Sequence, residues 1–204
     1  MKTWSDLLAQ EKQKNYFKDT LSYIADRRNE GVTIYPPQED VFNAFSATEF
    51  NKIKSAQKSG DIFEAWTAAQ ILSHRLGGCK KDSGALCSDI KSIEAKAGSD
   101  SHVARLSAII KKAESQTRRS QGFEDLLPFI SDGSAPAFLV KIAGQARSKL
   151  TNKALTDPAL SVIRADTLLE QALIREPEDP ETYVTLAQVY AAQGRFEESW
   201  DIQD

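Results

Sequence analysis

The chain has 204 residues, enough for one sizeable domain or two small ones with cores of their own. Its 26 basic and 29 acidic side chains give a net charge of −3, so no global field attracts a polyanion, and a nucleic-acid partner is not expected. No run of about 18 apolar residues occurs, and the opening MKTWSDLLAQEKQKN lacks the apolar core of a secretory signal. We therefore expect a cytoplasmic protein without a membrane anchor.

The chain offers few residues for metal or nucleophile chemistry. Cys79 and Cys87 could close a small loop in an oxidising compartment, whereas two free thiols are expected in a reducing one. A four-ligand zinc site would need both cysteines together with His74 and His102, and their spacing matches no zinc motif. We expect no metal and no cofactor.

Catalysis by another route also lacks its parts. Cys79 or Cys87 together with His74 is the one combination of nucleophile and base that the sequence offers. No orienting group or oxyanion pocket accompanies it. The stretches GDIFEAW, LGGCKKDSG and SDGSAP match neither the nucleotide P-loop nor the dinucleotide fingerprint. We assign no catalytic residue and expect that the chain is not an enzyme.

The first fifty residues predict two helices, a proline turn and a short aromatic helix. Thr3 followed by Asp6 is typical of a helix N-terminus, and a second apolar stripe ends at Gly31. Pro36 and Pro37 hold TIYPP extended, because proline fixes its own φ and moves the preceding residue out of the α region. Apolar positions on these helices are Trp4, Leu7, Leu8, Phe17, Leu21, Ile24, Val41, Phe42 and Phe45.

This stretch, and GVTIYPPQEDVFNAF within it above all, resembles the N-terminal region of bacterial uracil-DNA glycosylases. In that family these residues pack around a catalytic α/β domain. The family continues into a Gly-Gln-Asp-Pro-Tyr-His-Gly loop, whose aspartate helps to activate water, and later into a His-Pro-Ser-Pro loop, whose histidine stabilises the departing uracil. Neither loop is present here, and no proline occurs between Pro37 and Pro128. We interpret the segment as a structural piece without its active site, because the matched residues supply no pocket for an extruded base.

From residue 51 onward, apolar residues recur at helical spacing and predict helical hairpins. One seam runs from Ile62 to Leu76, a second from Leu86 to Ala97 and a third from Val103 to Ala113. The basic pairs Lys111–Lys112 and Arg118–Arg119 could face a phosphate, although a solvated helix face is the favoured interpretation. Pro128, Gly133 and Pro136 predict a hinge, after which Leu139, Ile142, Ala143, Ala146 and Leu150 resume the helical pattern.

Residues 180–204, PETYVTLAQVYAAQGRFEESWDIQD, resemble a tetratricopeptide repeat, a helix pair with a small-residue crossing. The second helix of a preceding unit matches ADTLLEQALIREPEDP. The matching positions are Ala165, Leu169, Ala172, Pro177, Tyr183, Leu186, Ala187, Tyr190, Gly194 and Ser199. This resemblance implies that ligands bind the concave face of the first helix.

On that face the resemblance places Glu181, Thr185, Gln188 and Ala191 as the candidate binding residues. None of the four is basic, which disfavours capture of an acidic peptide terminus and leaves solvent exposure of these side chains as the alternative. The unit before has no good first helix, since SKLTNKALTDPAL puts Asn152 and Lys153 where packing residues belong. The last unit stops early in its second helix, although such repeats are usually stable only in groups of about three.

These observations predict an all-α chain in three parts. Residues 1–50 form the glycosylase-like segment, residues 51–131 the helical hairpins, and residues 137–204 the tetratricopeptide-like region. The favoured function is a non-catalytic protein-protein interaction module with another protein or peptide as its partner. A glycosylase relative that lacks its catalytic motifs is the alternative. A joined or truncated chain would also explain the mixture of segments.

Overall fold

The computed structural model describes residues 51, 53, 55, 56, 58, 60–75, 85–98, 101–131, 133–177 and 179–202. Within this part of the chain every regular element is a helix and no strand occurs, so the predicted all-α class is confirmed. The predicted helices and proline turn of residues 1–50 lie outside the described residues. The contacts divide the described chain into two units. The first comprises the residues up to Ser107 together with Pro177 and Asp179, and the second comprises Ala108–Glu176 and the residues from Pro180 onward.

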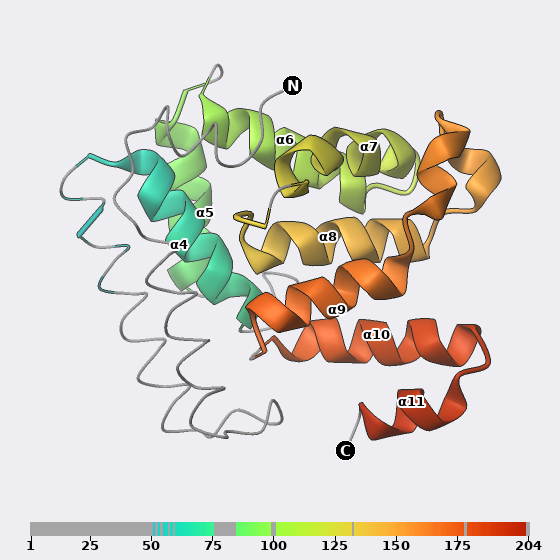
Figure 1. The fold of residues 1–204 in the computed structure, drawn as a ribbon. Helices are drawn as coiled ribbons and strands as arrows, with labels where there is room; N and C mark the ends of the chain where they lie inside the picture. The colour runs from blue at the N-terminus through green and yellow to red at the C-terminus, as the bar shows by residue number, and fades with distance from the viewer. Residues whose placement is uncertain are drawn as a thin grey trace. The chain divides into compact units, whose positions relative to one another are not determined.

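The first unit contains α4 (Ile62–Arg75), α5 (Ala85–Lys96) and the start of α6 (His102–Glu114) (Figure 1). The predicted seam of α4 is buried, since Trp66, Ala69 and Leu72 have no exposed surface. Helix α4 packs against α5, whose Ile90 and Ile93 are also buried. The apolar spacing therefore predicted both the helices and their inner faces correctly.

Polar side chains and a glycine set the ends of these helices. The Glu64 amide donates to Asp61 Oδ1 at 3.0 Å, which caps α4. The Ala104 amide donates to Ser101 Oγ at 3.1 Å, which caps α6 in the same way. After α5, Gly98 adopts a φ of +76°, a left-handed conformation that stops the helix without a Cβ clash.

One carboxylate joins α4, α5 and α6. Glu94 Oε1 on α5 accepts a hydrogen bond from Trp66 Nε1 of α4 at 3.3 Å. The same oxygen accepts another from Ser107 Oγ of α6 at 2.7 Å. The indole of a fully buried tryptophan needs such an acceptor, so Glu94 stabilises the packing of α4.

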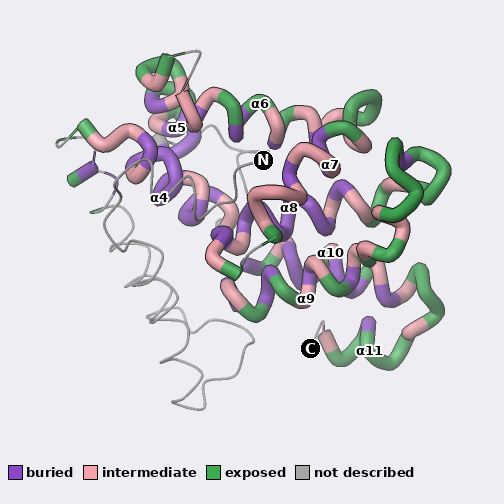
Figure 2. Tube along the Cα trace, turned by 45° about the horizontal axis from the view of Figure 1, so that its top comes forward, coloured by how far each residue is buried: buried purple, intermediate pink, exposed green. Residues whose placement is uncertain are grey.

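The second unit contains the rest of α6 and the helices α7 (Arg119–Ile130), α8 (Ala137–Ser148), α9 (Ala165–Arg175), α10 (Pro180–Ala192) and α11 (Phe196–Asp201). Two short 3-10 turns, η1 (Asn152–Ala154) and η2 (Pro158–Val162), lie between α8 and α9. Figure 1 shows α8, α9, α10 and α11 running alternately in opposite directions, each beside the next. Helix α8 is mostly buried and α11 mostly exposed (Figure 2).

The predicted hinge begins later than expected. Helix α7 continues through Pro128 to Ile130, and Ser131 is its C-cap. A proline in the last turn removes a single intrahelical hydrogen bond, and the Ser131 hydroxyl bonds the Pro128 carbonyl oxygen at 3.0 Å. The predicted domain boundary between residues 131 and 137 falls in the break before α8, within the second unit, and stays a prediction.

The structure decides the state of Cys87, which the sequence leaves open. This buried residue in the first turn of α5 is disulfide-bonded, while Cys79 lies outside the described residues. Sequence spacing left both states open, because the redox compartment decides between them.

Candidate functional site

The four candidate binding residues lie on α10, and the helix divides them. Glu181 Oε2 pairs with Lys141 Nζ of α8 at 3.2 Å. The Thr185 hydroxyl oxygen accepts a hydrogen bond from Gln145 Nε2, also on α8, at 3.3 Å. Gln188 is exposed and Ala191 half-buried. The first half of the predicted face thus contacts this chain's own α8, and the second half is open to solvent.

Small residues lie where the helices of each pair cross. A Cβ on Gly144 of α8 would come within 2.8 Å of Leu169 Cγ on α9, so a larger residue here would require the Leu169 side chain to shift. In the next pair, the buried Ser199 hydroxyl of α11 donates to the Ala187 carbonyl oxygen of α10 at 2.9 Å. A small residue in the first helix therefore allows close approach in both pairs.

Helix α8, which corresponds to the helical pattern predicted from Leu139 to Leu150, packs extensively along α9. The segment SKLTNKALTDPAL, for which the sequence predicts no good first helix, carries the turns η1 and η2.

A charged network holds the start of α9 against the turn between α10 and α11. Asp166, almost fully buried, accepts hydrogen bonds from the Arg164 guanidinium and from Arg195 Nη1, the latter at 3.0 Å. The Thr167 amide donates to the same carboxylate at 2.9 Å. The hydrogen bond from Arg164 is the main reason why the pKa of Asp166 lies below its usual value.

The same network reaches α10 and α11 through an aromatic ring. The Arg195 guanidinium lies 4.0 Å from the centre of the Tyr190 ring and also binds both carboxylate oxygens of Glu198. The Tyr190 hydroxyl donates to Glu170 Oε1 of α9 at 2.7 Å. Burial first and this hydrogen bond second raise the pKa of Tyr190 above its ordinary value. These contacts position α11 against α9 and α10.

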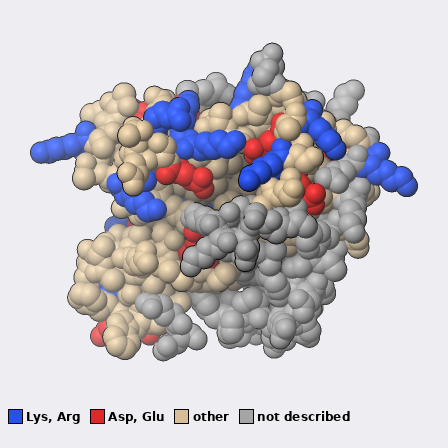
Figure 3. All heavy atoms as spheres, turned by 180° about the vertical axis from the view of Figure 1, so that it is seen from behind, with Lys and Arg blue, Asp and Glu red and all other residues tan. Residues whose placement is uncertain are grey.

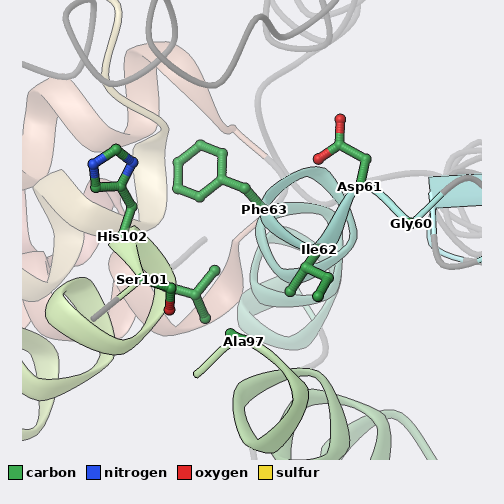
Figure 4. Close-up of a pocket in the computed structure, with 8 residues that line it drawn as sticks. Gly60, Asp61, Ile62, Phe63, Ala97, Ser101 and His102 are labelled. Atoms are coloured by element: carbon green, nitrogen blue, oxygen red, sulfur yellow. The ribbon is translucent and has the colours of Figure 1, made fainter. Parts of the chain in front are cut away.

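The first unit contains a separate hollow of about 440 Å³ between the starts of α4 and α6. Figure 4 shows the rings of Phe63 and His102 next to each other there, and they meet edge to face with centres 6.4 Å apart. Both helix starts are already capped by Asp61 and Ser101. The walls are formed by Gly60, Asp61, Ile62, Phe63, Ala97, Ser101, His102 and Val103.

The described residues contain no group of three or more His, Cys, Asp or Glu side chains placed to hold a metal ion. No helix in the described ranges is long and apolar enough to cross a membrane. Of the basic pairs, Lys112 binds Asp125 of α7 at 3.0 Å. Asp and Glu side chains lie among the Lys and Arg side chains on the face drawn in Figure 3.

Comparison with known proteins shows a similarity in the N-terminal region. Over 71 residues the chain is 58% identical to the uracil-DNA glycosylases of Yersinia pestis (strain Pestoides F) and Yersinia pseudotuberculosis (serotype O:3, strain YPIII). This stretch is 35% of the present chain and 31% of each relative, so the chain spans about a third of the length of the relatives it matches. No family model matches the chain. No solved structure matches it either.

Proposed function

We propose that residues 137–204 form a protein-interaction module of helical-repeat type, with two tetratricopeptide-like helix pairs, α8–α9 and α10–α11. The observation that carries the proposal is the seating of α10, which packs on α9 and also meets α8 through Lys141–Glu181 and Gln145–Thr185. Each pair contacts the next, which is how helical repeats build a continuous core and an extended binding surface.

The open half of α10 favours binding over catalysis. Gln188 is exposed and Ala191 half-buried, and neither is an acid, a base or a nucleophile. The proposed binding role depends on the shape of the helix surface and on helix packing, and we assign no catalytic residue. The partner is another protein or a peptide.

Affinity capture followed by mass spectrometry tests this function. The intact chain and a chain ending before Asp179 serve as baits, and a partner of the module is expected to be lost with α10 and α11. Truncation exposes the buried side of α9, which can capture proteins non-specifically. The test therefore considers only the partners that the truncated chain loses, and it disregards any that it gains. Intact Val162→Ala is the matched control, because Val162 is 80% exposed on η2. Capture of the same partners by both baits would refute the proposal.

A second candidate function rests on the similarity to uracil-DNA glycosylases, 58% over 71 residues. We propose that a chain with this segment but without the two catalytic loops does not excise uracil. Incubation with uracil-containing single-stranded DNA is the test, with a full-length glycosylase as positive control. Robust release of free uracil by the purified chain would establish the enzyme and overturn the proposal.

A further inference from the structure

The last helix pair exposes large apolar side chains on one side. Val184 of α10 is 56% exposed, and Phe196 and Trp200 of α11 are 62% and 72% exposed. Phe196 and Trp200 are four residues apart and therefore share one face of α11. Together with Gln188, these residues are called the open face below.

Helix geometry places both halves of the open face on the side away from α9. On α10, Tyr190 is directed at Glu170 of α9 and lies roughly 120° round the helix from Val184. On α11, Arg195 is directed at Asp166 of α9 and lies roughly 100° from Phe196. The crossing residues Ala187 and Ser199 lie between these two directions. The open face is thus the side on which a further helix would stack.

The preceding pair shows how such a face is covered. Measured from the crossing glycine, Lys141 is three positions before Gly144 and Gln145 is one position after it. Val184 and Gln188 hold the same positions relative to Ala187. Lys141 is fully buried and Gln145 is hydrogen-bonded, because α10 lies over them. The equivalent positions of the second pair are more than half exposed at Val184 and exposed at Gln188.

Charge indicates what would cover the open face. Glu197 and Asp201 are exposed on α11 and lie along one side of the stripe of Phe196 and Trp200. An occupant with basic residues beside its apolar stripe would complement the charges of Glu197 and Asp201. A second copy of the same face would instead bring like-charged carboxylates together, which is unfavourable.

We propose that the open face binds an amphipathic α-helix of a partner protein, with an apolar stripe against Val184, Phe196 and Trp200 and with basic residues beside Glu197 and Asp201. This inference rests on the proposed interaction function. The helix would lie on α10 and α11 as α10 lies on α8 and α9, and helix-in-groove binding of this kind depends on a few apolar anchors.

A designed peptide serves as the probe. It is a fluorescent helix of about 18 residues with leucine at i, i+3, i+4 and i+7 spacing and lysine elsewhere, and the matched control has glutamate in place of every lysine. Fluorescence anisotropy with the full chain is expected to show preferential binding of the lysine peptide. Trp200→Ala should weaken binding about tenfold or more, as expected for an aromatic anchor. Val162→Ala, which changes an exposed apolar residue elsewhere, should leave it unchanged.

Charge reversal gives a second, independent readout. The double variant Glu197→Lys and Asp201→Lys should transfer the preference to the glutamate peptide, and circular dichroism should show an unchanged helix content because both positions are exposed. Equal binding of both peptides, or equal effects of Trp200→Ala and Val162→Ala, would overturn the inference. Trp200-dependent dimerisation in sedimentation would also overturn it, because a second copy would then be the occupant.

Failure of this inference is separable from failure of the module. If no peptide binds but a captured partner disappears on truncation before Asp179, the partner uses another surface and the module stands. If truncation removes no partner, the module itself is refuted.

Discussion

Lys141 Nζ lies 3.2 Å from Glu181 Oε2, and the lysine side chain has no exposed surface. The two residues belong to α8 and α10. Their ion pair therefore joins two successive helix pairs, although α9 lies between α8 and α10 in the sequence. A buried ammonium is stabilised only where a counter-charge and hydrogen-bond acceptors compensate its lost hydration. The stacking of α10 on α8 is therefore electrostatic as well as apolar.

The first prediction concerns this ion pair. Glu181→Gln removes a counter-charge from a buried ammonium and should lower the free energy of unfolding by roughly 2 kcal/mol. Lys141→Met removes the buried charge while keeping the volume, and should be neutral or slightly stabilising. Urea unfolding followed by circular dichroism measures both. A larger loss for Lys141→Met than for Glu181→Gln would contradict the role given to Glu181.

The second prediction compares three glycines. A Cβ at Gly122 of α7 would lie 2.1 Å from the Ala113 backbone nitrogen of α6, and backbone cannot move aside. At Gly144 the obstructing atoms belong to the Leu169 side chain, which can shift. We expect Gly122→Ala to cost about 3 kcal/mol and Gly144→Ala about 1 kcal/mol.

Gly133→Ala is the control for that series, since nothing lies within 4 Å of its Cβ position. Its midpoint in urea should equal or slightly exceed that of the unchanged chain. If all three variants unfolded at the same midpoint, the result would contradict the proposal that close helix crossings at Gly122 and Gly144 make a Cβ destabilising.

The third prediction is a pH dependence from Asp166. Hydrogen bonds lower the folded-state pKa of Asp166 below 3.8, and the bond from Arg164 contributes most. The Asp166 carboxylate therefore binds a proton less readily in the folded protein than in the unfolded chain. The resulting stabilisation is fully present above about pH 4 and is lost as the pH falls through the folded-state pKa. Unfolding of the unchanged chain and of Asp166→Asn from pH 6 to pH 2 should therefore give stability curves that converge in acid. A difference that stays constant with pH would show that the carboxylate charge is not responsible.

The fourth prediction concerns Tyr190 at the opposite end of the pH scale. Burial and the hydrogen bond to Glu170 raise its folded-state pKa above 10, so its stabilising effect is complete below pH 10 and declines as the pH rises beyond it. Tyr190→Phe should cost about 1 kcal/mol at neutral pH, because it removes this hydrogen bond and keeps the ring beneath Arg195.

Absorbance titration of the phenol groups checks the same residue directly. The folded chain should keep one phenol un-ionised near pH 11 that titrates normally once the chain is unfolded in urea. If Tyr190→Phe left the delayed fraction unchanged, the delayed phenol would be another tyrosine.

The helices themselves followed from sequence. Trp66, Ala69 and Leu72 recur at the helical period and are buried in α4, and Gly98 and Gly194 end α5 and the α10–α11 turn at positive φ. Periodicity and glycine conformation are local properties, so a single chain reveals them. The candidate residues Glu181, Thr185, Gln188 and Ala191 were likewise placed correctly on one helix, although their binding role stays a prediction.

Only the tertiary structure decided which faces meet. It paired α8 with α9 across the turns η1 and η2, and it buried Lys141 beneath Glu181. It also brought Arg164 and Asp166 at the start of α9 together with Arg195 in the turn before α11. It also left Phe196 and Trp200 exposed, although their apolar character in the sequence is that of core residues. Helical spacing determines that a face is apolar, but the long-range packing of other helices determines whether that face is covered.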